Sequence, residues 1–517
     1  MIFRVVDTWQ TFILVLILSV ILFSCSDSGI DYKITTKVNP NRIAPLTAEL
    51  TITSEIPCRA TVKVLGAQPL EQIITQSSDS LVVPVLGLYP NSENKVLVTL
   101  EHAGGQLTDT VSIKTNPLPR WFPTIKINTL DREAMEPGLH GCDMHFANNG
   151  VFRSMPFIFD DAGQVRWYLD LGFHGKMVSP FQRAQNGNIL MVGRHSIYEI
   201  NMLGKIVKQT QIDKNYGMHH DVLELPDGNL LACVGKRDAY IDLNGEQVLS
   251  DSDFIMHYDR KSEQITKEWD LGKNLDVDRA DLNFFRPGDW LHMNGLVFDS
   301  KDGSIIVSAK NQGLIKLSSD DKLQWILSPK NNWGRSGRRG DGFDTNPFLL
   351  TAIDSNGNPY QSAIQNGMES ASDFDFPWGP HAPKFLPNGN LLVFDNGTYR
   401  NFNHSNNYSR AVEYEIDESA MTVRQVWQYG KERAEDFFSS IVSDVDYLPE
   451  TGNILITSGY LHPKTTHSGK IVEVDKSTNE EVFEATLFFK TLNGDKTVAG
   501  WGQTDILYRS QRMPLIN

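Results

Sequence analysis

One short cassette recurs five times along this 517-residue chain, and it constrains the fold more than any other feature. Each copy sets an X-Gly turn before an apolar run, the pattern of a tight hairpin that leads into a buried strand. The copies are Q-N-G-N-I-L-M-V-G-R-H (185–195), P-D-G-N-L-L-A-C-V-G-K (226–236), K-D-G-S-I-I-V-S-A-K-N (301–311), P-N-G-N-L-L-V-F-D-N-G (387–397) and E-T-G-N-I-L-I-T-S-G-Y (450–460).

A second hairpin signature follows several of the cassettes, so that each repeat holds about four strands. Segment 157–168 resembles the outer half of one further unit. Four-stranded units repeated in this way are typical of a β-propeller. The sequence therefore predicts an all-β chain with a six-bladed propeller. The second signature occupies 197–207, 241–248, 315–325 and 471–482.

The region before the repeats predicts a small separate domain. Residues 32–116 alternate short strands with turns, which suits an immunoglobulin-like β-sandwich. Pro117-Leu118-Pro119 marks a boundary, and we expect the catalytic propeller to occupy 120–517. The strands expected in the sandwich are Ala48–Thr53, Ala60–Leu65, Leu81–Leu86, Lys95–Leu100 and Thr108–Lys114.

The N-terminus predicts a lipoprotein. Residues 1–24 have the form of a signal peptide, and Leu22-Phe23-Ser24-Cys25 resembles a bacterial lipobox, so we expect lipid on Cys25 and a tether over 25–31. An uncleaved anchor, or a signal whose cysteine is incidental, is the alternative. The expected location is the periplasmic side of the cell envelope, and Ser26 after the cysteine favours the outer membrane.

Charge and cysteine content limit the partners and the cross-links. The net charge of -15 argues against nucleic acid, because a binder needs a basic face, but it leaves room for an anionic substrate at a locally positive site. A homodimer is compatible with the sequence. Cys58, Cys142 and Cys233 allow at most one bridge and have no metal-motif spacing, so we expect them to be buried apolar residues.

The repeat also sets polar residues in register. Counting back eight residues from the turn glycine gives Ser179, His220, His381 and Asp444 in four cassettes; in the third, one extra residue leads to Asn294, with His292 two before it. Counting forward seven gives Arg194 and Lys310. If the strand before each turn is the inner strand of its blade, these side chains converge at one mouth of the propeller.

Imidazoles, an amide and cations at one mouth suit chemistry on a tetrahedral oxyanion. They can donate hydrogen bonds to its oxygens, one neutral imidazole can attack the central atom, and another can move a proton. A histidine and aspartate cluster can instead bind a metal. Lys310 argues against that alternative, because a cation beside a metal ion is repelled, so no metal is expected.

At these residues the chain resembles the bacterial aryl sulfotransferases, a family with a small β-sandwich before a six-bladed propeller. The motifs that carry the resemblance are M-H-H-D-V (218–222), L-H-M-N-G (291–295), V-S-A-K-N-Q (307–312) and P-H-A-P-K-F-L-P-N-G-N-L-L-V-F-D-N-G (380–397). The resemblance implies that His381 takes the sulfuryl group of an aryl sulfate. It implies that His292, Asn294 and one of His219 and His220 hold sulfate oxygens; the repeat register selects His220.

Two positions depart from the family pattern. Lys310 stands where arginine is usual, so the bidentate fork is lost, and Pro380 stands where glutamine is common before the nucleophile. The resemblance implies ping-pong transfer from a phenolic sulfate to a phenol. No nucleotide-cradling sequence is present, so no nucleotide cofactor is expected. The alternatives are an aryl sulfatase that uses the same histidine and a lipoprotein propeller that only binds a ligand.

Overall fold

The structure is a computed structural model that describes residues 30–148, 151–171, 181–243, 245–279, 287–461, 466–490 and 505–516. The expected signal peptide, the expected lipidation site Cys25, most of the tether and Ser179 lie outside these ranges. Among the described residues, no helix combines the length and the apolar composition that crossing a membrane requires.

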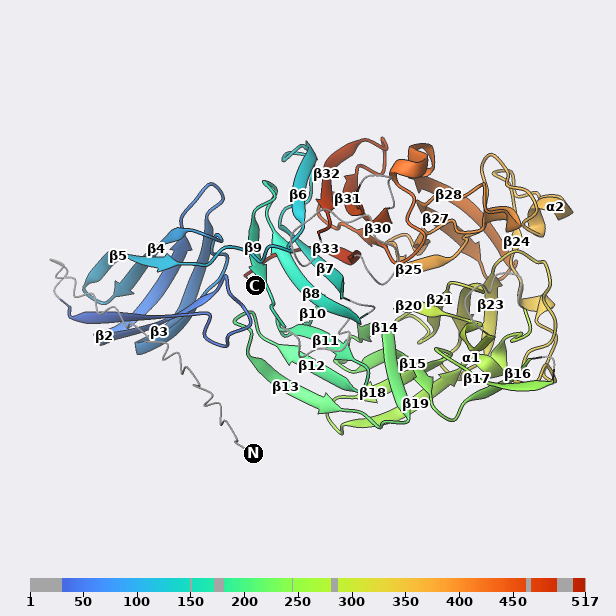
Figure 1. Cartoon of the computed structure of the whole chain (residues 1–517), viewed down its shortest axis with the longest axis horizontal. Helices are drawn as coiled ribbons and strands as arrows, with labels where there is room; N and C mark the ends of the chain where they lie inside the picture. Colours follow the sequence, from blue (N-terminus) through green and yellow to red (C-terminus); the bar gives the residue numbers. More distant parts are fainter. Residues whose placement is uncertain are drawn as a thin grey trace, which may run out of the picture.

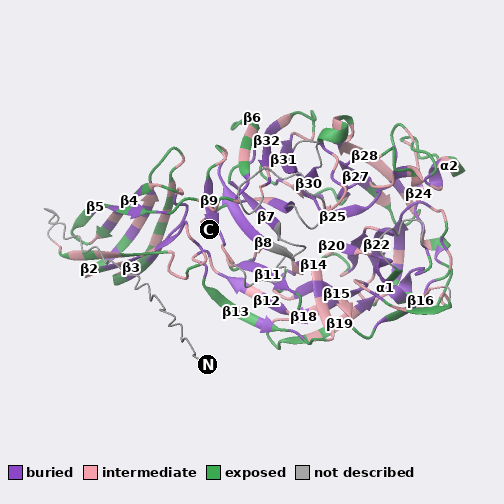
Figure 2. Cartoon of the chain, viewed as in Figure 1, coloured by how far each residue is buried: buried purple, intermediate pink, exposed green. Residues whose placement is uncertain are grey.

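The N-terminal domain is a five-stranded antiparallel sheet at one side of the molecule (Figure 1). Buried and exposed side chains alternate along its strands, which gives it one core-facing side (Figure 2). The expected strands 48–53 and 60–65 proved to be parts of one long strand, because β2 continues through register shifts around Cys58. The strands are β1 (Tyr32–Val38), β2 (Ala48–Val64), β3 (Leu70–Val85), β4 (Glu93–His102) and β5 (Gly105–Lys114).

In the rest of the described chain, six sheets of four or five strands lie around a common centre (Figure 1). Three of these sheets contain the first three cassettes, and each of the three is built from one continuous stretch of the chain. Their strands are β10 (Gln182–Arg183), β11 (Ile189–Gly193), β12 (Ser196–Ile200), β13 (Ile206–Gln211); β14 (Tyr216–Glu224), β15 (Leu230–Lys236), β18 (Phe254–Asp259), β19 (Gln264–Asp270); and β20 (Met293–Phe298), β21 (Ile305–Ala309), β22 (Gly313–Leu317), β23 (Leu323–Leu327).

The other three sheets contain the last two cassettes and the strands near the two ends of the propeller sequence, and two of them combine strands from distant parts of the chain. Two have five strands each, and the third joins the C-terminal strand to the first strands of the propeller. They comprise β25 (Pro380–Phe385), β26 (Leu391–Asp395), β27 (Arg410–Asp417), β28 (Thr422–Tyr429), β24 (Thr351–Ala352); β29 (Asp444–Tyr447), β30 (Ile454–Leu461), β31 (Ser468–Val474), β32 (Glu481–Phe488), β6 (Thr124–Leu130); and β33 (Ile506–Met513), β7 (Leu139–Asn148), β8 (Val151–Phe159), β9 (Val165–Tyr168).

The ring of sheets closes through both ends of the propeller sequence. β33 pairs with β7 and forms the inner edge of its sheet, whereas β6 pairs with β32 at the outer edge of another. β8 and β9 contain most of segment 157–168, which the repeat pattern predicts to be the outer half of a unit. Part of the inner half of this sheet is β33, a strand near the C-terminus that contains no copy of the cassette.

One predicted hairpin lies elsewhere than expected. The segment 241–248 forms β16 (Tyr240–Leu243) and β17 (Glu246–Leu249), a separate two-stranded sheet, and β18 and β19 supply the outer strands of that repeat. The few helices are one-turn segments in loops: α1 (Leu271–Asn274), α2 (Ser362–Gln365) and the 3₁₀ turns Pro287–Asp289, Asn346–Phe348, Arg400–Phe402 and Lys431–Asp436.

Side chains packed between the sheets form the propeller core. Four tryptophans are almost completely buried there, and the inner strands are largely buried (Figure 2). Cys58, Cys142 and Cys233 are buried free thiols, which confirms the expectation for them. The four tryptophans are Trp167, Trp290, Trp325 and Trp378.

Candidate active site

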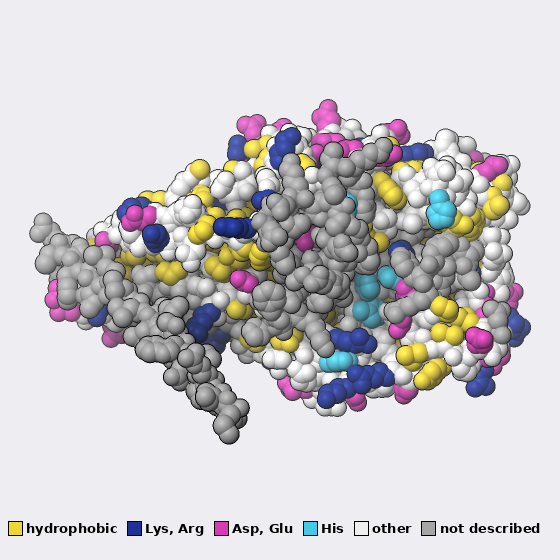
Figure 3. Space-filling view, viewed as in Figure 1, with side chains coloured by type: hydrophobic (Ala, Val, Ile, Leu, Met, Phe, Trp, Pro, Cys, Tyr) yellow, Lys and Arg dark blue, Asp and Glu magenta, His cyan; other side chains and the backbone are white. Residues whose placement is uncertain are grey.

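Four histidines, His219, His220, His292 and His381, gather at one end of three neighbouring inner strands, and we call them the histidine cluster. His219 and His220 lie on β14, His292 directly precedes β20, and His381 lies on β25. The Nδ1 atoms of His219 and His220 are 3.0 Å apart, and the rings of His220 and His292 are centred 5.0 Å apart. The convergence predicted from the repeat is therefore present. Figure 3 shows histidine side chains gathered on one face, near lysine and arginine side chains.

The backbone is irregular where the cluster forms. Register shifts interrupt the pairing between Met218 and Val222, between Met293 and Gly295, and between His381 and Lys384. His220 and His292 adopt φ values of 52° and 51°. Bulges re-aim side chains, and a left-handed non-glycine residue costs about 1–3 kcal/mol, a strain that is typical of functional sites.

His292 is oriented by a carboxylate. Its Nδ1 lies 2.8 Å from Oδ2 of Asp289, which is itself buried. If the Nδ1–H group donates to this carboxylate, proton transfer by His292 takes place at Nε2. Sequence reasoning did not identify Asp289, although its position three residues before His292 was a usable signal.

Asn294 is buried, and a hydrogen bond from its side chain holds the backbone next to His381 in place. Its Nδ2 donates to the carbonyl oxygen of Pro380 at 3.0 Å, and its Oδ1 accepts from the Ser308 hydroxyl at 2.6 Å. An amide nitrogen carries two hydrogens, so one further donor remains. The Asn294 side chain links β20 to β25 as well as lying among the predicted sulfate ligands.

The two predicted cations occupy different places. The backbone N–H of Lys310 donates to the carbonyl oxygen of His292, and a Cβ on Gly379 would lie 3.7 Å from Cγ of Lys310, so Lys310 stands beside the segment that precedes His381. Burial lowers the pKa of Lys310 to about 8. Arg194 is exposed and lies further out, beside His219 and Gly217.

The C-terminal strand supplies residues that the sequence analysis missed. The Tyr508 hydroxyl donates to the carbonyl oxygen of His220, and its ring contacts that of His381 at a centroid distance of 5.5 Å. Arg509 donates to Asp221 at 2.8 Å and to the carbonyl oxygen of Asn294 at 3.4 Å. The only sequence signal for Tyr508 and Arg509 was the incomplete repeat at 157–168. Because that segment supplies only outer strands, the inner strands of its sheet had to come from another part of the chain.

The electrostatic environment keeps the imidazoles of His219, His220 and His381 neutral. Burial, and next the nearby charge of Arg509, hold the pKa of His381 well below its usual value. Burial followed by His292 lowers the pKa of His220 in the same way, and lowers that of His219 to about 3. Nδ1 of His381 and Nε2 of His219 are buried without a hydrogen-bond partner in the described part of the chain. Such atoms are rare in native proteins and are candidates for binding a ligand.

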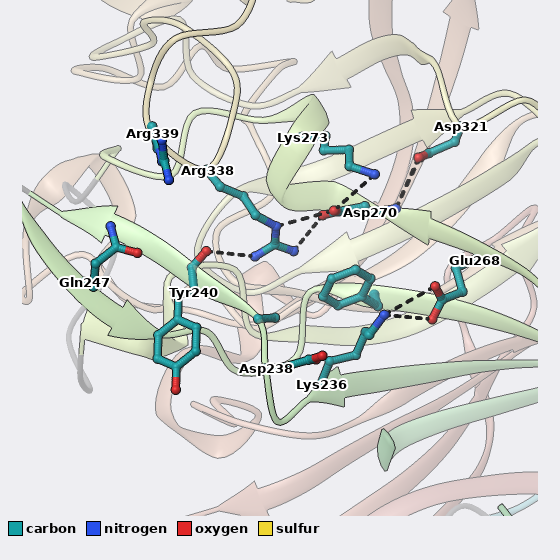
Figure 4. A pocket seen from close by; sticks show the side chains of 12 residues that line it. Lys236, Asp238, Tyr240, Gln247, Glu268, Asp270, Lys273, Asp321, Arg338 and Arg339 are labelled. Atoms are coloured by element: carbon teal, nitrogen blue, oxygen red, sulfur yellow. Dashed lines mark hydrogen bonds and ion pairs between the residues drawn. The ribbon is translucent and has the colours of Figure 1, made fainter. Parts of the chain in front are cut away.

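Two cavities adjoin each other near the cluster. The histidine cavity, about 410 Å³, is lined by His219, His220, Arg194 and neighbouring residues. A larger ion-paired groove, about 660 Å³, contains none of the four histidines (Figure 4). Lys236 lines both. No group of three or more potential metal ligands with suitable geometry occurs among the described residues.

Fold and site together define a β-propeller protein with an N-terminal β domain and a histidine-rich mouth. A family model described as Arylsulfotransferase (ASST) matches residues 129–494, and a model described as Arylsulfotransferase Ig-like domain matches residues 35–116. The chain belongs to the arylsulfotransferase family. The resemblance given above and the immunoglobulin-like class of the first domain are thereby confirmed.

Two relatives carry the name arylsulfate sulfotransferase AssT, one from Escherichia coli O6:H1 (strain CFT073) and one from Lelliottia amnigena. Each is 28% identical over 538 residues, which covers 86% of this chain and 88% of the relative. The β-propeller domain of Myceliophteria thermophila Cps50 (Swd1) has a TM-score of 0.33 and 10% identity, and covers 69% of this chain and 88% of that one. So low a TM-score carries no argument, and the propeller assignment rests on the sheets of this chain.

Proposed function

We propose that the chain is an aryl sulfotransferase that moves a sulfuryl group from a phenolic sulfate ester to a phenol, without a nucleotide donor. His381 is the nucleophile. The observation that supports this most is its state: it is buried and held neutral, its Nδ1 has no partner in the described part of the chain, and Lys310 and Arg509 supply positive charge nearby.

In the first half of the proposed reaction, a lone pair of neutral His381 attacks sulfur, an N–S bond forms, and the S–O bond to the aryl group breaks. The phenolate leaves with the bonding electrons and takes a proton from His292, which Asp289 orients. Lys310 and the imidazoles of His219 and His220 stabilise the sulfuryl oxygens as charge develops.

In the second half, a phenol approaches the sulfohistidine. His292 accepts its proton, the phenol oxygen attacks sulfur, and the N–S bond breaks with return of its electrons to His381. The cycle is ping-pong, because the first phenol leaves before the second enters. The same intermediate attacked by water would make a sulfatase, so the exclusion of water decides between the two outcomes.

The test is release of 4-nitrophenol from 4-nitrophenyl sulfate with and without added phenol, with His381→Ala and His257→Ala in parallel. His257 lies on β18, outside the cluster, and is the matched control. Incubation with ³⁵S-labelled donor alone should label the protein on the peptide that contains His381. Release that ignores phenol would indicate a sulfatase, and no release with any aryl sulfate would indicate a binding protein.

We further propose that lipid on Cys25 holds the chain at the periplasmic side of the membrane, from the lipobox-like sequence alone. Cys25→Ser should move the protein from the membrane fraction to the soluble fraction, and metabolic labelling with palmitate should be lost. A membrane-bound, unlabelled wild-type protein would contradict lipidation.

A further inference from the structure

The histidine cavity is rich in positive charge, on a protein whose net charge is -15. Two arginines, a lysine and three histidines line it, and Asp251 is the one carboxylate among its described lining residues. A cavity with such a lining concentrates anions even on an acidic protein. Its charged and imidazole residues are Arg194, His195, His219, His220, Lys236, Arg237 and Asp251.

Two of these cations, Arg194 and Arg237, form no ion pair with the residues that the structure describes. Arg194 lies in the turn between β11 and β12, and Arg237 follows β15, so adjacent sheets supply them. Both side chains are exposed. Within the residues that the structure describes, neither guanidinium has a carboxylate partner. Lys236 differs, because Glu268 binds its ammonium group at 3.3 Å.

Gly217 lets one arginine approach the cluster. A Cβ at this position would lie 3.3 Å from Nε of Arg194, which is tighter than an ordinary contact. The absence of a side chain on Gly217 therefore allows the Arg194 guanidinium to lie across β14, close to His219. Arg194 is also among the smaller causes, after burial and His292, of the lowered pKa of His219.

We propose that the histidine cavity is a subsite for a second anionic group on the substrate, distinct from the sulfuryl group that is transferred. This rests on the proposed function and extends it: the preferred phenols carry a carboxylate or sulfonate in addition to the phenolic oxygen. Guanidinium groups suit this role, because their planar donors match the paired oxygens of such anions. The sulfuryl group sits among His220, His292 and His381, and the second anion sits between Arg194 and Arg237.

The first experiment compares two acceptors of nearly equal shape and different charge. The full chain, with 4-nitrophenyl sulfate as donor, is given 4-hydroxyphenylacetate or 4-hydroxyphenylacetamide. We expect a higher kcat/KM for the acid, and a fall of about tenfold in the acid-to-amide ratio in Arg194→Gln/Arg237→Gln. Arg120→Gln removes an exposed arginine outside the cavity and should keep the ratio. An unchanged ratio in the double variant would overturn the proposal.

A second variant tests the position of the charge and leaves both arginines in place. Gly217→Ala adds only a methyl group, at a residue whose φ is not left-handed, and it should push Arg194 outward. We expect a smaller fall in the same ratio, about threefold. A ratio equal to that of the wild type would show that Arg194 does not act from this position and would overturn its part in the subsite.

Failure of the proposed function can be told apart from failure of this inference. If no aryl sulfate is turned over, calorimetric titration of the full chain with the acid and the amide still tests the subsite. Binding of the acid alone, lost in Arg194→Gln/Arg237→Gln and weakened by salt, would support it. Equal binding of the two compounds, or no binding of either, would contradict it.

Discussion

The histidine cavity and the ion-paired groove adjoin each other, share Lys236 and contain similar numbers of cations, yet they differ in how those cations are compensated. In the groove, Arg338 pairs with Asp253 and Asp270, and Lys273 also approaches Asp270 (Figure 4). In the histidine cavity the two arginines have no carboxylate partner within the described chain. The comparison teaches that the pairing of cations with carboxylates distinguishes a binding site from a structural ion-pair network. The volume of the cavity and the number of charges that line it distinguish the two less well.

The physical reason is the balance of desolvation and pairing. A cation that already holds a carboxylate gains little from a ligand anion, because the ligand must displace or compete with that partner. A cation held by the fold without a partner can give its full interaction to a ligand. Substitutions should therefore alter activity on the histidine side and stability on the groove side.

The largest expected effect is that of His381→Ala. Loss of the nucleophile should lower kcat for sulfuryl transfer at least about a thousandfold. Stability should stay unchanged or rise, since a buried nitrogen without a partner is removed. Steady-state kinetics and urea unfolding measure the two quantities, and a stable variant that keeps near wild-type kcat would remove His381 from the mechanism.

Arg338→Gln in the groove should behave in the opposite way. It leaves the fully buried carboxylate of Asp253 without its ion pair, which should cost about 3 kcal/mol of unfolding free energy, while kcat/KM stays within about twofold. Urea unfolding checks the first part. A variant as stable as the wild type, or one with strongly impaired transfer, would break the comparison.

The same variant has a predictable pH dependence. Burial already raises the pKa of Asp253 above its ordinary value of 3.8, and loss of the Arg338 charge raises it further. A carboxyl with a raised folded-state pKa favours folding when protonated, so its contribution is lost as pH rises through that range. The stability deficit of Arg338→Gln should therefore be smaller near pH 4 than at pH 7.

Asp289→Asn should have an intermediate effect that depends on the leaving group. Without the carboxylate, His292 loses its orienting partner and delivers a proton less well. We expect kcat/KM for phenyl sulfate to fall about a hundredfold, and much less for 4-nitrophenyl sulfate, whose phenolate leaves without a proton. Equal losses for the two donors would mean that Asp289 acts on structure alone.

The smallest expected effect comes from Lys310. Its pKa of about 8 means that the ammonium is charged below pH 8 and neutral above it, so kcat/KM for the donor should fall about fivefold as pH rises through 8. Lys310→Arg should abolish this fall, because a guanidinium stays charged. A fall that persists unchanged in the variant would assign it to another group.

The sequence predicted the histidines of the cluster well. The turn glycines fix where each inner strand ends, and strand alternation fixes which side chains share a face, so His220, His292 and His381 could be placed at one mouth. Arg194 was expected at the same mouth as Lys310 and the histidines, and the structure places it in the lining of the histidine cavity, which does not include Lys310.

What the sequence determined by itself is the local part of this protein: the repeats, the hairpins, the buried cysteines and the strand ends that carry the histidines. These follow from neighbouring residues, through turn chemistry and apolar alternation. Only the tertiary structure decided which charges meet. Tyr508 and Arg509 reach His220 and Asp221 across 288 positions because the C-terminal strand closes the ring. Whether a cation is paired or available depends on distances through space, which no local pattern records.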